Sequence, residues 1–168
     1  MSYQNKALFL DRDGIINVDS GYVHKVEDFV FVDGLHKLLK SYQEDGYKLI
    51  VVTNQSGIGR GYYTEEDYMG LTEHMVNELL KKDIKIEAVY HCPHSPQDKC
   101  SCRKPRSGMF MAAKKDHKLD MKSSIMIGDK DSDMIAAKSA KVGSRILVSK
   151  SDSCEEATKV VKDIKSIK

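Results

Sequence analysis

The chain has 168 residues, which fits one compact domain over residues 1–168. Hydrophobic residues make up 40% of it and charged residues 31%, with a formal net charge of +2. This balance is ordinary for a globular protein and does not indicate a nucleic-acid-binding surface. No segment approaches the roughly 18 apolar residues that span a bilayer, and residues 1–6 lack the apolar core of a signal peptide. We therefore expect a cytoplasmic monomer without nucleic-acid or membrane partners.

Short apolar segments alternate with longer amphipathic ones. Segments of strand length lie at 7–10, 49–52, 88–90, 125–127 and 145–148. Between them, one helical pattern ends at Gly46 and another begins at the N-cap residue Thr64. This alternation predicts an α/β fold with a doubly wound parallel sheet and helices on both faces. In the segment 159–168, lysines alternate with apolar residues, and we interpret it as the solvent-exposed face of a helix.

The first predicted strand is followed by Asp11, Arg12, Asp13 and Gly14. Side chains two positions apart on an extended segment point to the same side, so the two carboxylates can converge. Such a pair suits Mg²⁺, and it suits a nucleophile beside a proton donor and acceptor. Aspartate and glycine are also common in solvated turns, so this motif alone does not decide between the two interpretations.

Other polar groups follow the later strands. The segment 53–61 begins with a threonine and contains several glycines, which offers hydrogen-bond donors to a phosphoryl group. Asp129 and Lys130 follow the strand at 125–127, although a helix N-terminus also favours aspartate. Lys104 follows the third strand and its loop, where its charge can balance a phosphate. In parallel sheets, ligands bind beyond the carboxyl ends of the strands, which is where all of these residues fall.

Cys92, His94, Cys100 and Cys102 lie close together between the third strand and the lysine that follows it. Three thiols and an imidazole are ligands of tetrahedral structural zinc, and cysteines in a cytoplasmic chain are more often metal ligands than disulfides. We expect Zn²⁺ to hold the shape of a small zinc loop over residues 92–102 and to do no chemistry. The alternative is a chance grouping. Cys154 lies outside the pattern, and we interpret it as a free surface thiol.

Taken together, Asp-x-Asp-Gly, a threonine, a lysine and Gly-Asp at successive strand ends resemble the haloacid-dehalogenase superfamily of aspartyl phosphatases. The resemblance covers nearly the whole chain. It implies that Asp11 is the nucleophile and Asp13 the general acid and base. It also implies that Asp11, Asp13 and Asp129 hold a catalytic Mg²⁺, while Thr53 and Lys104 hold the phosphoryl oxygens.

The chain departs from the superfamily at Ile15, where a threonine is usual; we expect little consequence, because this position shapes the turn. The intervals from Asp13 to Thr53 and from Thr53 to Lys104 are each filled by one helix, one strand and a loop. No cap domain fits into them. The selectivity of an uncapped site must come from nearby loops.

The zinc loop narrows the resemblance to two sister branches, the heptose-bisphosphate phosphatases and the histidinol-phosphate phosphatases. Segments 9–14, 17–24 and 53–61 are more similar to the heptose branch, as is Lys130, where the histidinol branch is expected to have arginine. The short gap between the second and third zinc-loop ligands is a departure, because some heptose enzymes carry a longer insert. The heptose branch implies removal of the 7-phosphate of D-glycero-D-manno-heptose 1,7-bisphosphate, with the product feeding lipopolysaccharide or other surface glycans.

The same resemblance implies which residues bind the sugar phosphate. They are Arg12, Asp19, Ser20, Gly21, Tyr22, Thr53, Asn54, Gln55, Ser56, Arg103, Lys104 and Lys130.

Two interpretations from other classes remain open. A phospho-receiver domain also has acids, a threonine and a lysine at the strand ends of a doubly wound sheet, but its phosphorylated aspartate normally follows a later strand and no zinc loop is expected. A zinc-dependent nucleic-acid-binding protein is disfavoured by the near-neutral charge and by the lack of an aromatic platform.

Overall fold

The computed structural model describes residues 3–150 and 153–167. Its strands are β1 (Ala7–Leu10), β2 (Lys48–Asn54), β3 (Ile86–Cys92), β4 (Ile125–Gly128), β5 (Ser144–Val148) and β6 (Lys159–Val161). Its α-helices are α1 (Leu35–Glu44), α2 (Ser56–Gly59), α3 (Glu65–Leu80), α4 (Gly108–His117) and α5 (Asp131–Ser139), and short 3₁₀ helices lie at η1 (Val26–Asp28) and η2 (Ile164–Ser166). Among these residues, no helix is long and apolar enough to cross a membrane.

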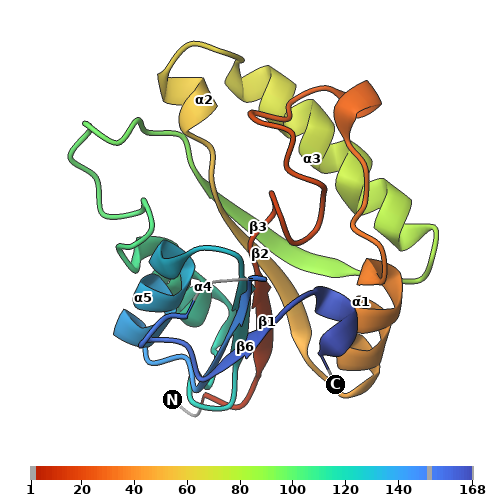
Figure 1. Cartoon of the computed structure of the whole chain (residues 1–168), viewed down its shortest axis with the longest axis vertical. Helices are drawn as coiled ribbons and strands as arrows, with labels where there is room; N and C mark the ends of the chain where they lie inside the picture. The colour runs from red at the N-terminus through yellow and green to blue at the C-terminus, as the bar shows by residue number, and fades with distance from the viewer. Residues whose placement is uncertain (1–2, 151–152, 168) are drawn as a thin grey trace.

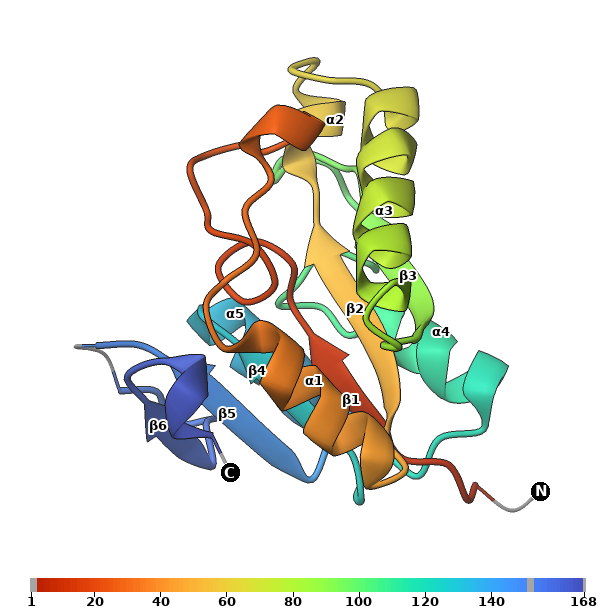
Figure 2. The same ribbon diagram turned by 90° about the vertical axis from the view of Figure 1, so that its right-hand side faces the viewer.

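The strands form one parallel sheet with helices on both faces (Figures 1 and 2). Over the described residues its order is β3-β2-β1-β4-β5-β6, and every pairing is parallel. Helices α1 and α3 pack on one face, and α4 and α5 pack on the other. The predicted doubly wound sheet without a cap domain is therefore confirmed.

The central strand β1 shows why the sheet has two covered faces. Leu8 and Leu10 belong to the core beneath α1 and α3, whereas Ala7 and Phe9 belong to the core beneath α4 and α5. The ring of Phe9 packs against that of Phe110 on α4, with centroids 4.9 Å apart. A strand buried on both sides is apolar throughout, which is why its sequence shows no polar alternation.

The helical patterns of the sequence are confirmed in α1 and α3. Gly46, at φ 89°, follows the end of α1 in a left-handed conformation that favours glycine. The side chain of Thr64 accepts a hydrogen bond from the Asp67 amide, and the Asp67 carboxylate accepts one from the Thr64 amide. This capping box fixes the start of α3. Four residues of α1 are buried as its pattern predicts: Leu35, Leu38, Leu39 and Tyr42.

The C-terminal segment is not the helix face that its sequence suggested. Lys159–Val161 forms the edge strand β6, which pairs with β5, and a 3₁₀ helix follows it. The reason is burial, because Val161, Ile164 and Ile167 all pack into the core next to α1. Lys168 lies outside the described residues. An edge strand of three residues is too short for its sequence to show a strand period.

Candidate active site and zinc loop

Asp11 lies directly after β1 and is almost completely buried. Its Oδ1 is 3.0 Å from the Nζ of Lys104, which is also 2.6 Å from the Oδ1 of Asp133. The same ammonium group donates to the Val52 carbonyl at 2.8 Å. Burial opposes the charge on Lys104, but the carboxylates of Asp11 and Asp133 outweigh it and raise its pKa. The site therefore holds a fixed positive charge next to Asp11.

The carboxylates of Asp11, Asp129 and Asp133 form a group in which one oxygen from each lies within 4.8 Å of the others. Burial and the charge of Asp133 raise the pKa values of both Asp11 and Asp129. The Oδ1 of Asp129 is buried and has no hydrogen-bond partner among the described residues. A buried oxygen without a partner, in a group of carboxylates, fits a hard divalent cation such as Mg²⁺. The side chain of Asp13, an expected Mg²⁺ ligand, is not in this group.

The carboxylate of Asp13 is held by three donors instead. Its Oδ1 accepts from the Arg12 guanidinium at 2.7 Å and from the Asn17 amide at 3.0 Å, and its Oδ2 accepts from the Gln55 amide at 3.0 Å. Arg12, one of the predicted substrate-binding residues, is 2% exposed and also donates to the Val23 carbonyl at 2.6 Å. The structure thus places Arg12 beneath the site, where it fixes Asp13, and not on the surface of the cleft.

Glycines allow the acidic loops to approach each other. Gly14 has φ 94°, and a Cβ added there would lie 2.2 Å from the Oδ2 of Asp129. A Cβ added to Gly128 would lie 2.5 Å from the side chain of Asp133. Ile15, the departure noted in the sequence, is completely buried and packs in the core beneath α1 and α3.

A cleft of about 520 Å³ opens beside Asp13 and Lys104, and it brings together most of the predicted substrate-binding residues. Ser20 does not line it, and Thr53 is completely buried. Four lining residues were not predicted: Arg60, Tyr63, Pro105 and Ser132. The lining residues that the sequence predicted are Asp13, Asp19, Gly21, Tyr22, Asn54, Gln55, Ser56, Arg103, Lys104 and Lys130.

Asn54 joins the end of β2 to the segment that leaves the zinc loop. Its Oδ1 accepts from the Lys104 backbone amide at 3.0 Å, and its Nδ2 donates to the Lys104 carbonyl at 3.1 Å. This paired contact fixes the backbone of Lys104, so that the lysine side chain can reach Asp11. Asn54 therefore has a structural role as well as a place in the cleft.

Asp133 is a site residue that the sequence analysis did not select. It lies in the first turn of α5 and is 1% exposed. Its Oδ2 accepts from the backbone amides of Asp129 and Lys130, at 3.2 and 3.1 Å. The carboxylate thus shapes the loop after β4 while its other oxygen pairs with Lys104. An acid in the turn after a Gly-Asp motif was the available signal, but such a residue also caps a helix.

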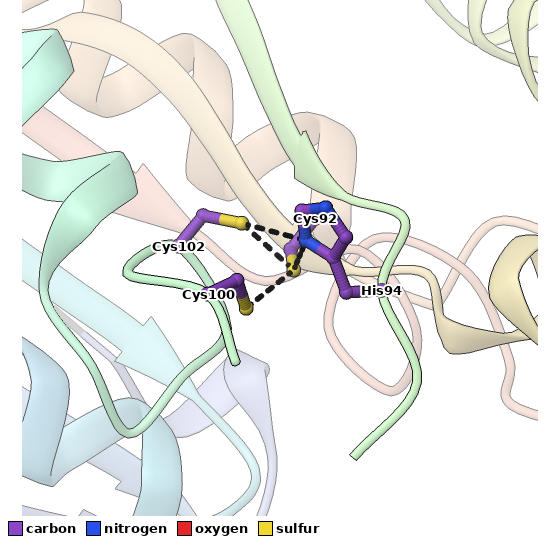
Figure 3. Close-up of side chains that lie close together, drawn as sticks. All are labelled: Cys92, His94, Cys100 and Cys102. Carbon is purple, nitrogen blue, oxygen red and sulfur yellow. Dashed lines mark hydrogen bonds between the residues drawn. The ribbon is translucent and has the colours of Figure 1, made fainter. Parts of the chain in front are cut away.

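The four predicted zinc ligands converge at the end of β3 (Figure 3). The Sγ of Cys92 is 2.9 Å from that of Cys102 and 3.8 Å from that of Cys100. The Nδ1 of His94 is 3.3 and 3.2 Å from the Sγ atoms of Cys92 and Cys102. All these cysteines are free thiols, and three thiols with an imidazole fit one tetrahedral Zn²⁺. Cys154 lies elsewhere, half-buried, with its thiol on Glu156 at 3.2 Å.

The zinc loop packs directly on the loop after β2. The backbone amide of Gln55 donates to the Cys92 carbonyl at 2.8 Å, and the backbone amide of Gly59 donates to the Pro93 carbonyl at 2.8 Å. A Cβ on Gly59 would lie 2.7 Å from that carbonyl oxygen, so only glycine allows the approach. The zinc loop consequently supports the segment after β2, whose residues Gln55 and Ser56 line the cleft.

The fold and the site together define a haloacid-dehalogenase-like phosphatase. The central strand carries the buried aspartate, and the order β3-β2-β1-β4-β5-β6 differs from the 2-1-3-4-5 order of receiver domains. The chain is similar over its length to a crystal structure of D,D-heptose 1,7-bisphosphate phosphatase from B. bronchiseptica complexed with magnesium and phosphate. That structure is 28% identical, with a TM-score of 0.85 and coverage of 94% of this chain and 93% of the other.

Sequence comparison identifies the family and the branch to which the chain belongs. A model of the polynucleotide kinase 3 phosphatase family matches residues 7–161. The chain is 48% identical to D-glycero-alpha-D-manno-heptose-1,7-bisphosphate 7-phosphatase of Campylobacter jejuni, over 98% of this chain and 94% of the relative. It is 50% identical to D-glycero-beta-D-manno-heptose-1,7-bisphosphate 7-phosphatase of Helicobacter pylori, over 86% of this chain and 83% of the relative. The chain belongs to this phosphatase family and, within it, to the branch of the heptose-bisphosphate phosphatases.

Proposed function

We propose that this chain removes the 7-phosphate of D-glycero-D-manno-heptose 1,7-bisphosphate and keeps the 1-phosphate. The observation that carries this proposal is the convergence of Asp11, Asp129, Asp133 and Lys104 at one sheet edge, in a chain whose relatives with this activity align over most of its length. A buried carboxylate beside a fixed cation and a candidate Mg²⁺ site is the arrangement that phosphoryl transfer to an aspartate requires.

In the proposed reaction, a carboxylate oxygen of Asp11 attacks the phosphorus of the 7-phosphate and displaces the sugar oxygen. Asp13 gives its proton to that oxygen, and heptose 1-phosphate leaves. Asp13 then takes a proton from a water molecule, whose oxygen attacks the phospho-aspartate and releases inorganic phosphate. Lys104 and Thr53 hold the phosphoryl oxygens during both steps.

The expected ligands of Mg²⁺ are Asp11, Asp13 and Asp129, and the geometry adds Asp133 as a further candidate. Mg²⁺ bound there would balance the charge of the carboxylates and of the phosphoryl oxygens. Lys130 lies at the same edge. Burial opposes its charge, but the carboxylates of Asp129 and Asp11 outweigh it and raise its pKa, so it remains a cation for the substrate.

The retained 1-phosphate needs a cation at the rim of the cleft, and Arg103 is the residue that we assign to it. Arg103 lines the cleft directly after the zinc loop, and its Nη1 is buried with no hydrogen-bond partner among the described residues. A guanidinium group can hold two phosphate oxygens at once. Asp19, Gly21 and Tyr22 line the cleft too, and we expect them to contact the sugar.

Zn²⁺ held by the four residues of Figure 3 would fix the loop that directly precedes Arg103 and Lys104. With all four positions taken by protein, such a site has no place for a substrate oxygen. On its composition, we further expect the enzyme to act as a monomer in the cytoplasm.

The proposal is tested by following the hydrolysis of both anomers of heptose 1,7-bisphosphate with ³¹P NMR. Both anomers are needed because the named relatives differ in the anomer that they use. We expect the 7-phosphate signal to be lost and the 1-phosphate signal to persist, with Mg²⁺ required. Loss of the 1-phosphate, or no hydrolysis of either anomer, would contradict the proposal.

A further inference from the structure

A buried chain of hydrogen bonds leads from Asp13 to Tyr63, a residue that the reaction outlined above does not use. The Nε2 of Gln55 donates to the Oδ2 of Asp13 at 3.0 Å and to the Oγ1 of Thr53 at 2.9 Å. The Oε1 of Gln55 accepts from the hydroxyl of Tyr63 at 2.5 Å. Gln55 is 2% exposed and Tyr63 is 6% exposed, so solvent does not compete for the bonds of Gln55 to Tyr63 and Thr53.

Asp13 and Tyr63, the two ends of this hydrogen-bond network, favour the same orientation of the Gln55 side-chain amide. The Oδ2 of Asp13 and the Oγ1 of Thr53 both accept from the NH₂ group of the Gln55 side chain, so this group faces them. Tyr63 supplies the complementary bond, because burial raises its pKa to about 12 and keeps the hydroxyl a donor. A rotated amide would place two acceptors, the Oε1 atom and the carboxylate, against each other.

The position of the Tyr63 ring is fixed by contacts that do not involve Gln55. The ring stacks on His24, with centroids 4.8 Å apart and planes inclined by 8°. Gly57 also lies against the ring, because a Cβ added to Gly57 would be 2.1 Å from the Cε1 of Tyr63. These contacts hold the hydroxyl in place independently of its bond to Gln55, so Tyr63 anchors this hydrogen-bond network.

The side-chain amide of Gln55 also orients the hydroxyl group of Thr53. Because the Oγ1 of Thr53 accepts from Gln55, its hydroxyl hydrogen must point elsewhere. Among the described residues, its acceptor is the Asn54 carbonyl, at 3.5 Å, which is a weak contact. Thr53 is completely buried, and its hydroxyl oxygen helps to hold the Gln55 side-chain amide.

We propose that Tyr63 is a positioning residue for phosphoryl transfer: through Gln55 it directs Asp13 toward the leaving oxygen. This inference rests on the proposed function. Tyr63 itself does not contact the reacting atoms of the substrate. Removal of its hydroxyl should therefore affect only the step in which Asp13 must be directed at the leaving oxygen.

The test compares two leaving groups in single-turnover reactions of the Mg²⁺-loaded enzyme. A sugar alkoxide must be protonated as it leaves, whereas p-nitrophenolate leaves without a proton. We expect Tyr63→Phe to slow the release of heptose 1-phosphate about tenfold, a part of the roughly 10²–10⁴-fold that a general acid contributes. The release of p-nitrophenolate should change less than about twofold. An equal loss with both substrates, or no loss with either, would overturn the inference.

The matched control is Tyr62→Phe, because Tyr62 is the neighbouring tyrosine but is 55% exposed, with its ring against that of Tyr22. It should leave both rates unchanged. A second variant, Gln55→Leu, removes the intermediate link and should show the same selective loss. The double variant should then be no slower than Gln55→Leu alone, because the two residues act as one unit. Multiplied losses would overturn the inference. If the wild-type enzyme hydrolyses neither substrate, it is the proposed function that fails.

Discussion

Asp11 lies at the centre of the charged groups of the site. It is buried, it pairs with Lys104, and it lies in one group with Asp129 and Asp133. The raised pKa that burial and Asp133 give it means that a cation is needed to keep it ionised and nucleophilic. The nearby lysine supplies part of this charge, and a divalent cation would supply the rest.

We predict that Asp11→Asn abolishes turnover while the protein still folds. The amide keeps the size of the side chain but cannot attack phosphorus, and loss of a nucleophile costs several orders of magnitude. Phosphate release is the measurement, and a thermal melt with the zinc content checks the fold. If more than about a hundredth of the activity remained, the covalent mechanism would be wrong.

At the rim of the cleft, Arg103→Ala should raise KM for the bisphosphate about tenfold or more, because a charge-assisted contact contributes about 1.5–3 kcal/mol. A sugar monophosphate that carries only the reacting phosphate is the internal control, and its KM should change little. Steady-state kinetics with both substrates measure the difference. A similar rise for the two substrates would show that Arg103 does not hold the second phosphate.

At the scale of single elements, the turn after β1 depends on a glycine. Gly14→Ala would place a methyl group 2.2 Å from the Asp129 carboxylate at a positive φ, so we predict loss of Mg²⁺ affinity together with lower stability. Gly70→Ala in α3 is the matched control: nothing lies within 4 Å of its Cβ position, and the change should stabilise the helix by about 0.5–1 kcal/mol. Titration of activity with Mg²⁺ and a thermal melt measure both effects. Equal behaviour of the two variants would contradict the structure of this turn.

The zinc loop is the second element on which the site depends, because Arg103 and Lys104 directly follow it. Cys100→Ser should lower the zinc content below one per chain and lower the melting temperature, since structural zinc is coupled to folding. Cys154→Ser is the control, because this thiol lies outside the cluster, and it should keep both values. Metal analysis and calorimetry give the two readouts. If Cys100→Ser changed neither, the assignment of four ligands would fail.

The elements also show which parts of the fold were predictable. The strands with both faces covered carry continuous apolar segments, so they could be located from the sequence, and the rule that ligands bind at their carboxyl ends placed Asp11, Asp129 and Lys104 together. The edge strand β6 was missed because it has three residues and buries few of them.

The remaining differences come from the directions of side chains, which the sequence does not contain. Arg12 turns beneath the site because the Val23 carbonyl and Asp13 accept its hydrogen bonds. Asp133 joins the acidic group because the turn after β4 directs it there, and Tyr63 reaches Gln55 because of how its loop folds back. Each of these positions is decided by a tertiary contact, and motif spacing cannot supply it.

At the scale of the whole molecule, an uncapped domain gains its selectivity from the loops around one open cleft. Loop 19–22, the segment after β2 and residues 103–105, which directly follow the zinc loop, surround this cleft, and cations line its rim. A substrate with two phosphates can pair with the inner cations and the rim at the same time. A substrate with one phosphate and an amine cannot use the rim arginine in this way.

The most direct test of the central claim is the ratio of kcat/KM for heptose 1,7-bisphosphate to that for histidinol phosphate, measured with Mg²⁺ on the zinc-loaded enzyme. We predict that the bisphosphate is preferred at least about tenfold, which corresponds to about 1.4 kcal/mol of transition-state binding. Equal or faster hydrolysis of histidinol phosphate would contradict the assignment to the heptose substrate, even if Asp11 proves to be the nucleophile.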